Sequence, residues 1–283
     1  MTFRLNCIAA LCAALPVAAL AQDDKTMGTV TVTEPRLVSP GETAIGEAAL
    51  APMRAATSDT ARLLLDIPGV SLYGAGGVSS LPAIRGLADD RLRIQVDGMD
   101  LMAACPNHMN SALSYIDPSR VAAITVFAGI TPVSVGGDSI GGTIQVKSAP
   151  PRFADSAEQS QASGQVGAFY RSNGNASGFN LGAEYVAPEL YLSYNGSLAR
   201  SDNYSAGGDF KPAGPGTVGG PWLTGSEVGS SAYNARNHDI GLAWRRDQHL
   251  LQLNVSQQNI PFEGFPNQRM DMTANDSTQV NLR

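Results

Sequence analysis

The half of the chain that follows Pro150 and Pro151 consists of short segments in which apolar and polar residues alternate. Alternation of this kind is typical of β-strands whose two faces meet different surroundings. The alternating segments are residues 165–171, 179–186, 190–199, 239–246 and 250–256. Tight turns join some of them, whereas 204–232 form a long loop rich in glycine and proline. Unequal loops at the two ends favour an outer-membrane β-barrel, although a soluble β-sandwich alternates in the same way.

The first residues have the pattern of a secretory signal peptide. A basic start at Arg4 is followed by an apolar run over 7–20 and by the small-x-small cleavage site Ala19-Leu20-Ala21. The apolar run is shorter than a membrane-spanning helix requires. We therefore expect residues 1–21 to be removed on export.

Residues 22–48 are predicted to be a flexible lead segment, because proline, glycine and small polar residues interrupt any periodicity. A short isolated strand within it can add to the edge of a partner's sheet through main-chain hydrogen bonds. An ordinary β-prone piece of linker is the alternative. The strand covers 28–33 and includes Thr29, Val30, Thr31, Val32 and Thr33.

Residues 49–150 have the mixed pattern of a small α/β domain. Ser58 and Asp59 precede an apolar run that Pro68 ends, which predicts a short helix. Strands are predicted over 92–97, 123–128 and 143–146, and a helical turn over 118–120.

Soft metal ligands are concentrated in one stretch of this domain. Thioether, thiolate and imidazole are the ligands that Cu(I) prefers. Pro106 favours the first turn of a helix, which would return Met109 to the side of Cys105. Methionine and cysteine are also ordinary core residues, so packing alone is the alternative. The stretch contains Met99, Met102, Cys105, His108 and Met109.

Cys105 is the cysteine that remains once the signal peptide is removed, because Cys7 and Cys12 leave with it. It then has no partner in the sequence for an intramolecular disulfide. A leftover cysteine in an exported protein indicates an intermolecular bond, a reactive thiol or a ligand. The neighbouring soft donors favour a metal ligand.

The order of these parts resembles that of the TonB-dependent outer-membrane receptors. Blocks similar to those of the family's plug domain occur in family order at 59–70, 84–86, 93–98, 118–121 and 136–144. The resemblance implies a small mixed α/β plug domain followed by the first strands of an antiparallel transmembrane β-barrel. The family's barrels have about 22 strands, so residues 151–283 are expected to be the N-terminal part of a barrel. It also implies that 29–33 pair with the inner-membrane TonB protein, and that the barrel contacts outer-membrane lipid.

Within that family, Cys105 and Met109 are similar to the Cys-x-x-x-Met pair that copper receptors of the OprC/NosA type carry on the plug. In those receptors a His-x-Met pair from the barrel completes the site. The nearest counterpart here is Met270-Asp-Met272, in which methionine replaces the histidine. The resemblance therefore implies copper as the cargo. Further candidate ligands are His108, Met102 and Met99.

The expected function is import of copper across the outer membrane of a Gram-negative cell. One alternative is a receptor for a siderophore or other metal chelate, with the soft residues as packing. Another is a periplasmic copper-binding protein that does not transport. No catalytic constellation is visible in the sequence, so an enzyme is not expected. The net charge of −6 and the lack of a basic patch in the sequence argue against a nucleic-acid partner.

Overall fold

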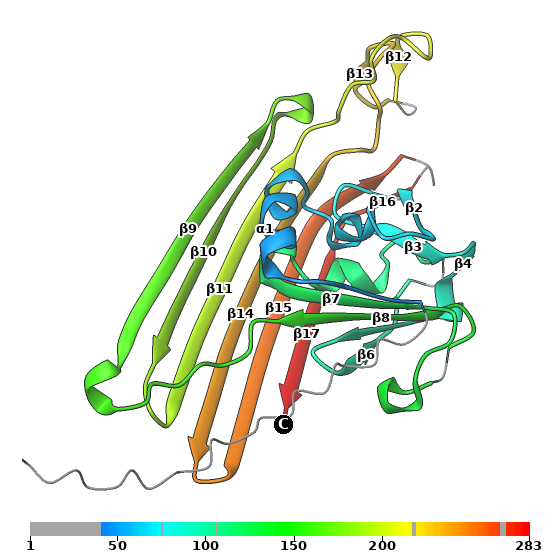
Figure 1. The fold of residues 1–283 in the computed structure, drawn as a ribbon. Coiled ribbons are helices and arrows are strands. Elements are labelled where there is room, and N and C mark those ends of the chain that lie inside the picture. The colour runs from blue at the N-terminus through cyan, green and yellow to red at the C-terminus, as the bar shows by residue number, and fades with distance from the viewer. Residues whose placement is uncertain (1–40, 75, 106, 138, 217–218, 267–269) are drawn as a thin grey trace, which may run out of the picture. The chain divides into compact units, whose positions relative to one another are not determined.

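The structure, a computed structural model, describes residues 41–283 except 75, 106, 138, 217–218 and 267–269. The expected signal peptide over 1–21 and the expected TonB-binding strand over 29–33 lie outside the described residues. Among the helices that are described, none is both long and apolar enough to cross a membrane. Two sheets contain most of the strands (Figure 1).

The first sheet has five strands in the order β1-β7-β8-β5-β6. Strands β5 and β8 run parallel, and the other neighbours are antiparallel. Its strands are β1 (Glu42–Ile45), β5 (Leu92–Val96), β6 (Met99–Leu101), β7 (Val121–Ala128) and β8 (Gly142–Ser148). A smaller sheet contains β2 (Val70–Gly74), β3 (Ser80–Ile84) and β4 (Leu87–Ala88). The helical elements are α1 (Glu47–Ala56) and the 3₁₀ turns η1 (Thr60–Leu64), η2 (Asp89–Arg91), η3 (Ala112–Tyr115), η4 (Pro118–Arg120) and η5 (Val133–Val135).

One hydrophobic core holds this domain together. It joins α1, η1 and the central strands, because Leu50, Leu64 and Ile144 are each 0% exposed and belong to a single cluster. The strands predicted over 92–97, 123–128 and 143–146 are confirmed as β5, β7 and β8. Burial of these apolar side chains is the main favourable contribution to the fold of the domain.

Two local features of this domain differ from the sequence-based expectation. The helix expected after Ser58 and Asp59 is the 3₁₀ turn η1, which Asp59 caps by accepting a hydrogen bond from the Ala61 amide at 3.0 Å. Residues 42–48, which we expected within the lead segment, contribute β1 to the sheet and the start of α1. The pairing of β1 with β7 is a long-range interaction that the local pattern of 42–45 does not encode.

The second sheet is antiparallel throughout, in the order β16-β15-β14-β11-β10-β9, and β17 also pairs with β15. The five predicted strand segments are confirmed, and each is longer than predicted. Strands β16 and β17 were not predicted. The strands are β9 (Gln161–Arg171), β10 (Ala176–Val186), β11 (Leu190–Ser201), β14 (Tyr233–Arg246), β15 (His249–Phe265), β16 (Met270–Met272) and β17 (Asn275–Leu282).

The connections at one end of this sheet are short, whereas the other end has both a short turn at 172–175 and a long loop. Residues 187–189 and 247–248 are tight links, whereas 202–232 form a long loop that carries the short pair β12 (Gly214–Pro215) and β13 (Trp222–Leu223) (Figure 1). Small turns also lie at η6 (Ala157–Gln159) and η7 (Asn173–Asn175).

The second sheet has an apolar outer face and a polar inner face, as the strands of a membrane barrel do. Apolar side chains such as Val166 (68% exposed) and Ile240 (57% exposed) lie on the outer face. Polar side chains such as Asp239 and Gln258 are buried on the inner face, against the first domain. A soluble β-sandwich would bury its apolar face instead, whereas barrels of the outer membrane expose it. The sheet therefore has the two faces of a transmembrane barrel wall, and we refer to it as the barrel wall; the first domain lies on its inner side.

Candidate metal centre

The segment after β6 carries the candidate ligands of the plug-like domain. The carbonyl of Cys105 accepts a hydrogen bond from the His108 amide at 2.9 Å, which closes a turn. His108 has a φ of 51°, in the left-handed region, and the next helical element, η3, begins only at Ala112. The expectation of a helix that begins at residue 106 is therefore wrong.

Side chains from the loop before β3 explain why this segment is a turn. The Ser79 hydroxyl donates to the Met109 carbonyl at 2.6 Å and accepts from the Ser111 amide at 3.1 Å. The Ser111 hydroxyl in turn donates to the carbonyl of Ser80 at 2.7 Å. A helix would pair these backbone groups internally, and serine side chains compete for them here. The serines thus fix the backbone from Met109 to Ser111.

Cys105 and Met109 of the plug domain still belong to one hydrophobic cluster, which also contains residues of the second sheet. Met109 (9% exposed) packs on Phe265 (1% exposed), the last residue of β15. Cys105 and Met272, both half-buried, pack against this pair. We refer to Cys105, Met109 and Met272 as the sulfur cluster. Its members come from both domains and lie far apart in the sequence.

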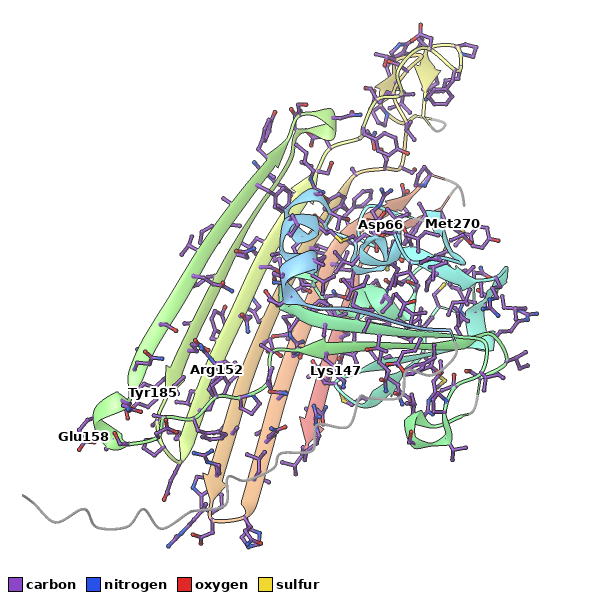
Figure 2. The ribbon with its side chains drawn as sticks, viewed as in Figure 1. Asp66, Lys147, Arg152, Glu158, Tyr185 and Met270 are labelled. Carbon is purple, nitrogen blue, oxygen red and sulfur yellow. The ribbon has the colours of Figure 1, made fainter. Side chains whose placement is uncertain are left out.

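The other candidate ligands lie outside the sulfur cluster. Met102 is 82% exposed, and Met99 lies half-buried in β6 opposite Val96. Met270 is 48% exposed and pairs with Phe265 across β15 and β16. It lies at the opposite end of the sheet from Tyr185, which stands near the tight link after β10 (Figure 2).

The His108 ring lies near two acidic side chains. Its ring nitrogens lie 4.0 Å from carboxylate oxygens of Asp89 and of Asp90. Over the described part of the chain, no group of three or more His, Cys, Asp or Glu side chains is placed to hold a metal ion. The donors of the sulfur cluster are one thiol and two thioethers, which suit a soft ion.

A buried ionic contact also joins the two domains. The Arg120 guanidinium, on η4, lies 3.4 Å from Asp97 at the end of β5 and 3.1 Å from Asp239 on β14. All three side chains are only 8% exposed, and Arg120 also donates to the Ser256 hydroxyl at 2.8 Å. The local sequence pattern does not predict this contact, because Asp97, Arg120 and Asp239 lie far apart in the chain.

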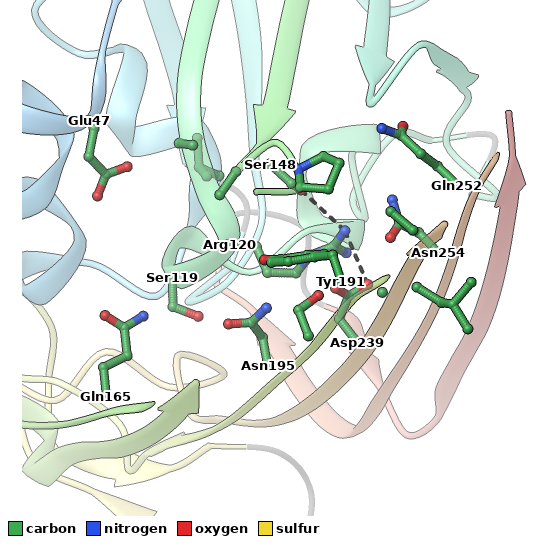
Figure 3. Close-up of a pocket in the computed structure, with 18 of the residues that line it drawn as sticks. Glu47, Ser119, Arg120, Ser148, Gln165, Tyr191, Asn195, Asp239, Gln252 and Asn254 are labelled. Carbon is green, nitrogen blue, oxygen red and sulfur yellow. Dashed lines mark hydrogen bonds and ion pairs between the residues drawn. The ribbon is translucent and has the colours of Figure 1, made fainter. Parts of the chain in front are cut away.

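A polar cavity lies beside this ionic contact, between the first domain and the barrel wall (Figure 3). Amide and hydroxyl groups, which suit bound water, make up much of its lining. The sulfur cluster does not contribute to it. The cavity is therefore separate from the candidate metal centre. Its lining includes Gln165, Ser193, Asn195, Gln252 and Asn254.

Asp100, next to Met99 in β6, is held in an ion pair. Hydrogen bonds from the Arg93 guanidinium, at 2.7 Å to each carboxylate oxygen, hold the pKa of Asp100 below its usual range. The stability that this pair contributes is present above the ordinary pKa of an aspartate and is lost as the pH falls through the lowered value. The Asp100 carboxylate is thus already paired with Arg93.

Comparison with known proteins assigns the first domain. Residues 42–143 match the family model of the TonB-dependent receptor plug domain. Among solved structures, the chain is similar to the copper transporter OprC, with 26% identity and a TM-score of 0.69 over 86% of this chain and 34% of OprC. Residues 42–143 are therefore a TonB-dependent receptor plug domain. The chain comprises this plug domain and strands like those that begin the receptor barrel.

Two further receptors share the fold at lower identity. The FrpB iron transporter from Neisseria meningitidis has 16% identity and a TM-score of 0.62, over 86% of this chain and 36% of FrpB. The ferric enterobactin receptor PfeA from Pseudomonas aeruginosa, in complex with enterobactin, has 18% identity and a TM-score of 0.54, over 78% of this chain and 33% of PfeA. No curated protein sequence matches the chain. The chain spans about a third of the length of these solved receptors.

Proposed function

We propose that this receptor imports copper across the outer membrane and captures it at the sulfur cluster. The observation that carries the proposal is the meeting of Cys105 and Met109, from the plug, with Met272, from the barrel wall. A thiolate and two thioethers form a donor set that suits Cu(I) and is poor for Mg, Ca or Mn. The similarity to a copper transporter at 26% identity supports the same cargo.

The structure favours Met272 over Met270 as the barrel-side ligand. In the copper receptors that the plug motif resembles, a His-x-Met pair serves this role, and Met270-Asp-Met272 is its counterpart here. Met272 packs in the cluster at the position of the methionine, whereas Met270 replaces the histidine and is 48% exposed. We propose that Cys105, Met109 and Met272 bind the ion. Met99, Met102 and His108, which lie outside the cluster, are not needed for this set.

The remaining parts of the transport cycle follow from the family. We propose that a signal peptide over 1–21 exports the chain, that the apolar outer face of the sheet contacts outer-membrane lipid, and that residues 29–33 pair with TonB as an added strand. Pulling on the lead segment would then move the plug and release copper toward the periplasm. No catalytic step is part of this proposal.

A receptor for iron or an iron chelate is the second candidate. It is favoured by the fold that the chain shares with FrpB and PfeA, whose identities of 16% and 18% support the fold alone. Uptake assays in cells distinguish the two candidates. We expect the receptor to raise cellular copper and to leave iron uptake unchanged; iron uptake without copper uptake would favour the second candidate.

Replacing Met272 with leucine is expected to weaken Cu(I) binding by at least about tenfold, since a thioether ligand is lost while the volume is kept. Met270→Leu is the matched control, because it makes the same change two residues away on a side chain outside the cluster. Competition with a chromophoric Cu(I) chelator measures both affinities. Equal affinities for Met272→Leu and the wild type would remove Met272 from the site.

A further inference from the structure

Glu263 is a carboxyl group buried at the boundary between the plug and the barrel wall. The residue lies near the end of β15 and is 0% exposed. Its Oε1 accepts a hydrogen bond from the Val78 amide of the plug at 3.3 Å, and its Oε2 has no hydrogen-bond partner within the described structure. A Cβ added at Gly76 would lie 2.3 Å from Glu263 Oε1, so the glycine permits this close approach. Burial of such a group costs free energy that other interactions must offset.

Glu263 has contacts that lead to both halves of the sulfur cluster. On the barrel side, Glu263 is the direct cross-strand partner of Met272. On the plug side, Glu263 accepts a hydrogen bond from the Val78 amide. The hydroxyl of the next residue, Ser79, donates to the carbonyl of Met109 at 2.6 Å. A continuous path of contacts therefore runs from Met272 through Glu263 and the loop at 76–79 to Met109.

We infer that Glu263 is a positioning residue that sets the spacing between Met272 and the Cys105–Met109 pair. The geometry of this role comes from the contacts above. Its effect on copper affinity rests on the proposed function. Metal ligands on two separate domains bind well only when the supporting groups hold them at coordinating separation. The Glu263–Val78 bond is a polar contact that ties the plug loop to the hairpin carrying Met272, beside the apolar packing of Val78 and Met272 in one cluster.

Two substitutions separate the acceptor role from simple packing. Glu263→Gln keeps an amide oxygen that can accept from Val78 at almost the same volume, whereas Glu263→Leu removes the acceptor. The first readout is independent of copper: the rate of disulfide formation between Cys105 and a cysteine introduced by Met272→Cys, with diamide as oxidant and chelator present. The second readout is the Cu(I) affinity of the variants with native Met272.

We expect Glu263→Gln to cross-link and bind copper like the wild type, within about twofold. Glu263→Leu is expected to slow cross-linking and to weaken copper binding by about 10–100-fold, the range found for residues that orient metal ligands. Wild-type behaviour of Glu263→Leu in both assays would overturn the inference. A third outcome is that Glu263→Leu slows cross-linking but the wild-type protein binds no copper. This outcome would support the positioning role of Glu263 and refute the copper function.

Limited proteolysis of the plug shows whether Glu263→Leu is folded. Should this variant be unfolded, Ser79→Ala carries the test, because it breaks the next contact in the path without touching β15. Ser79→Ala is then expected to slow cross-linking in the same way. A wild-type cross-linking rate for a folded Ser79→Ala would overturn the inference.

Discussion

Replacing Cys105 with serine is expected to weaken Cu(I) binding by more than about 100-fold, because residues that only support metal ligands already contribute about 10–100-fold. In the proposed site Cys105 is the thiolate ligand of the bound ion, and Met109 and Met272 are thioether ligands. A serine hydroxyl has nearly the same size but is a poor ligand for a soft ion. The measurement is the dissociation constant for Cu(I), obtained by chelator competition with the full chain in detergent.

Met102→Leu is the control for this experiment. Met102 belongs to the same soft-donor stretch but is 82% exposed and outside the cluster, so its replacement is expected to leave the affinity unchanged. A Cys105→Ser protein that binds copper as tightly as the wild type would contradict the assignment. An equal loss in Met102→Leu would show that the ion binds elsewhere on the stretch.

Replacing Arg120 with alanine is expected to lower the free energy of unfolding by about 3–5 kcal/mol, as removal of one partner from a buried ion pair does. The substitution leaves the carboxylates of Asp97 and Asp239 facing each other with only 8% exposure each. The effect is measured by urea unfolding monitored through tryptophan fluorescence. Because the pair joins the plug to the wall, we also expect faster proteolysis of the plug.

Arg91→Ala is the matched control, since its side chain is 57% exposed and its ion pair with Asp89 is long, at 3.9 Å. We expect a change of at most about 0.5 kcal/mol there, as for other surface substitutions. Adding Asp97→Asn and Asp239→Asn to Arg120→Ala should recover part of the lost stability, because no buried charge is left unpaired. Equal stabilities of Arg120→Ala and Arg91→Ala would refute the role of Arg120 as an anchor.

The sequence alone predicted those parts of the fold that have a strong local pattern. Alternation located β9, β10, β11, β14 and β15, because one face of the wall is apolar and the other polar. It missed β17, whose residues 275–282 are mostly polar, and β16, which has only three residues. The ends of the strands were also missed, since strand length there is fixed by pairing with a neighbour.

The candidate site was predictable only from its chemistry. The soft donors identified Cys105 and Met109, and the Met-x-Met pair included Met272. The expected helix failed because Ser79, from another loop, takes the backbone groups around Met109. The roles of Phe265 and Glu263 depend on contacts between segments far apart in the chain, and such contacts leave no local signal in one sequence.

X-ray absorption spectroscopy at the copper edge, on the full chain loaded with one equivalent of Cu(I), shows whether sulfur ligands from both domains bind the ion. We expect a coordination shell dominated by sulfur in the wild type, with fewer sulfur ligands in Met272→Leu and an unchanged shell in Met270→Leu. A shell made only of nitrogen and oxygen, or a sulfur shell that Met272→Leu leaves intact, would contradict capture of copper between the plug and the barrel wall.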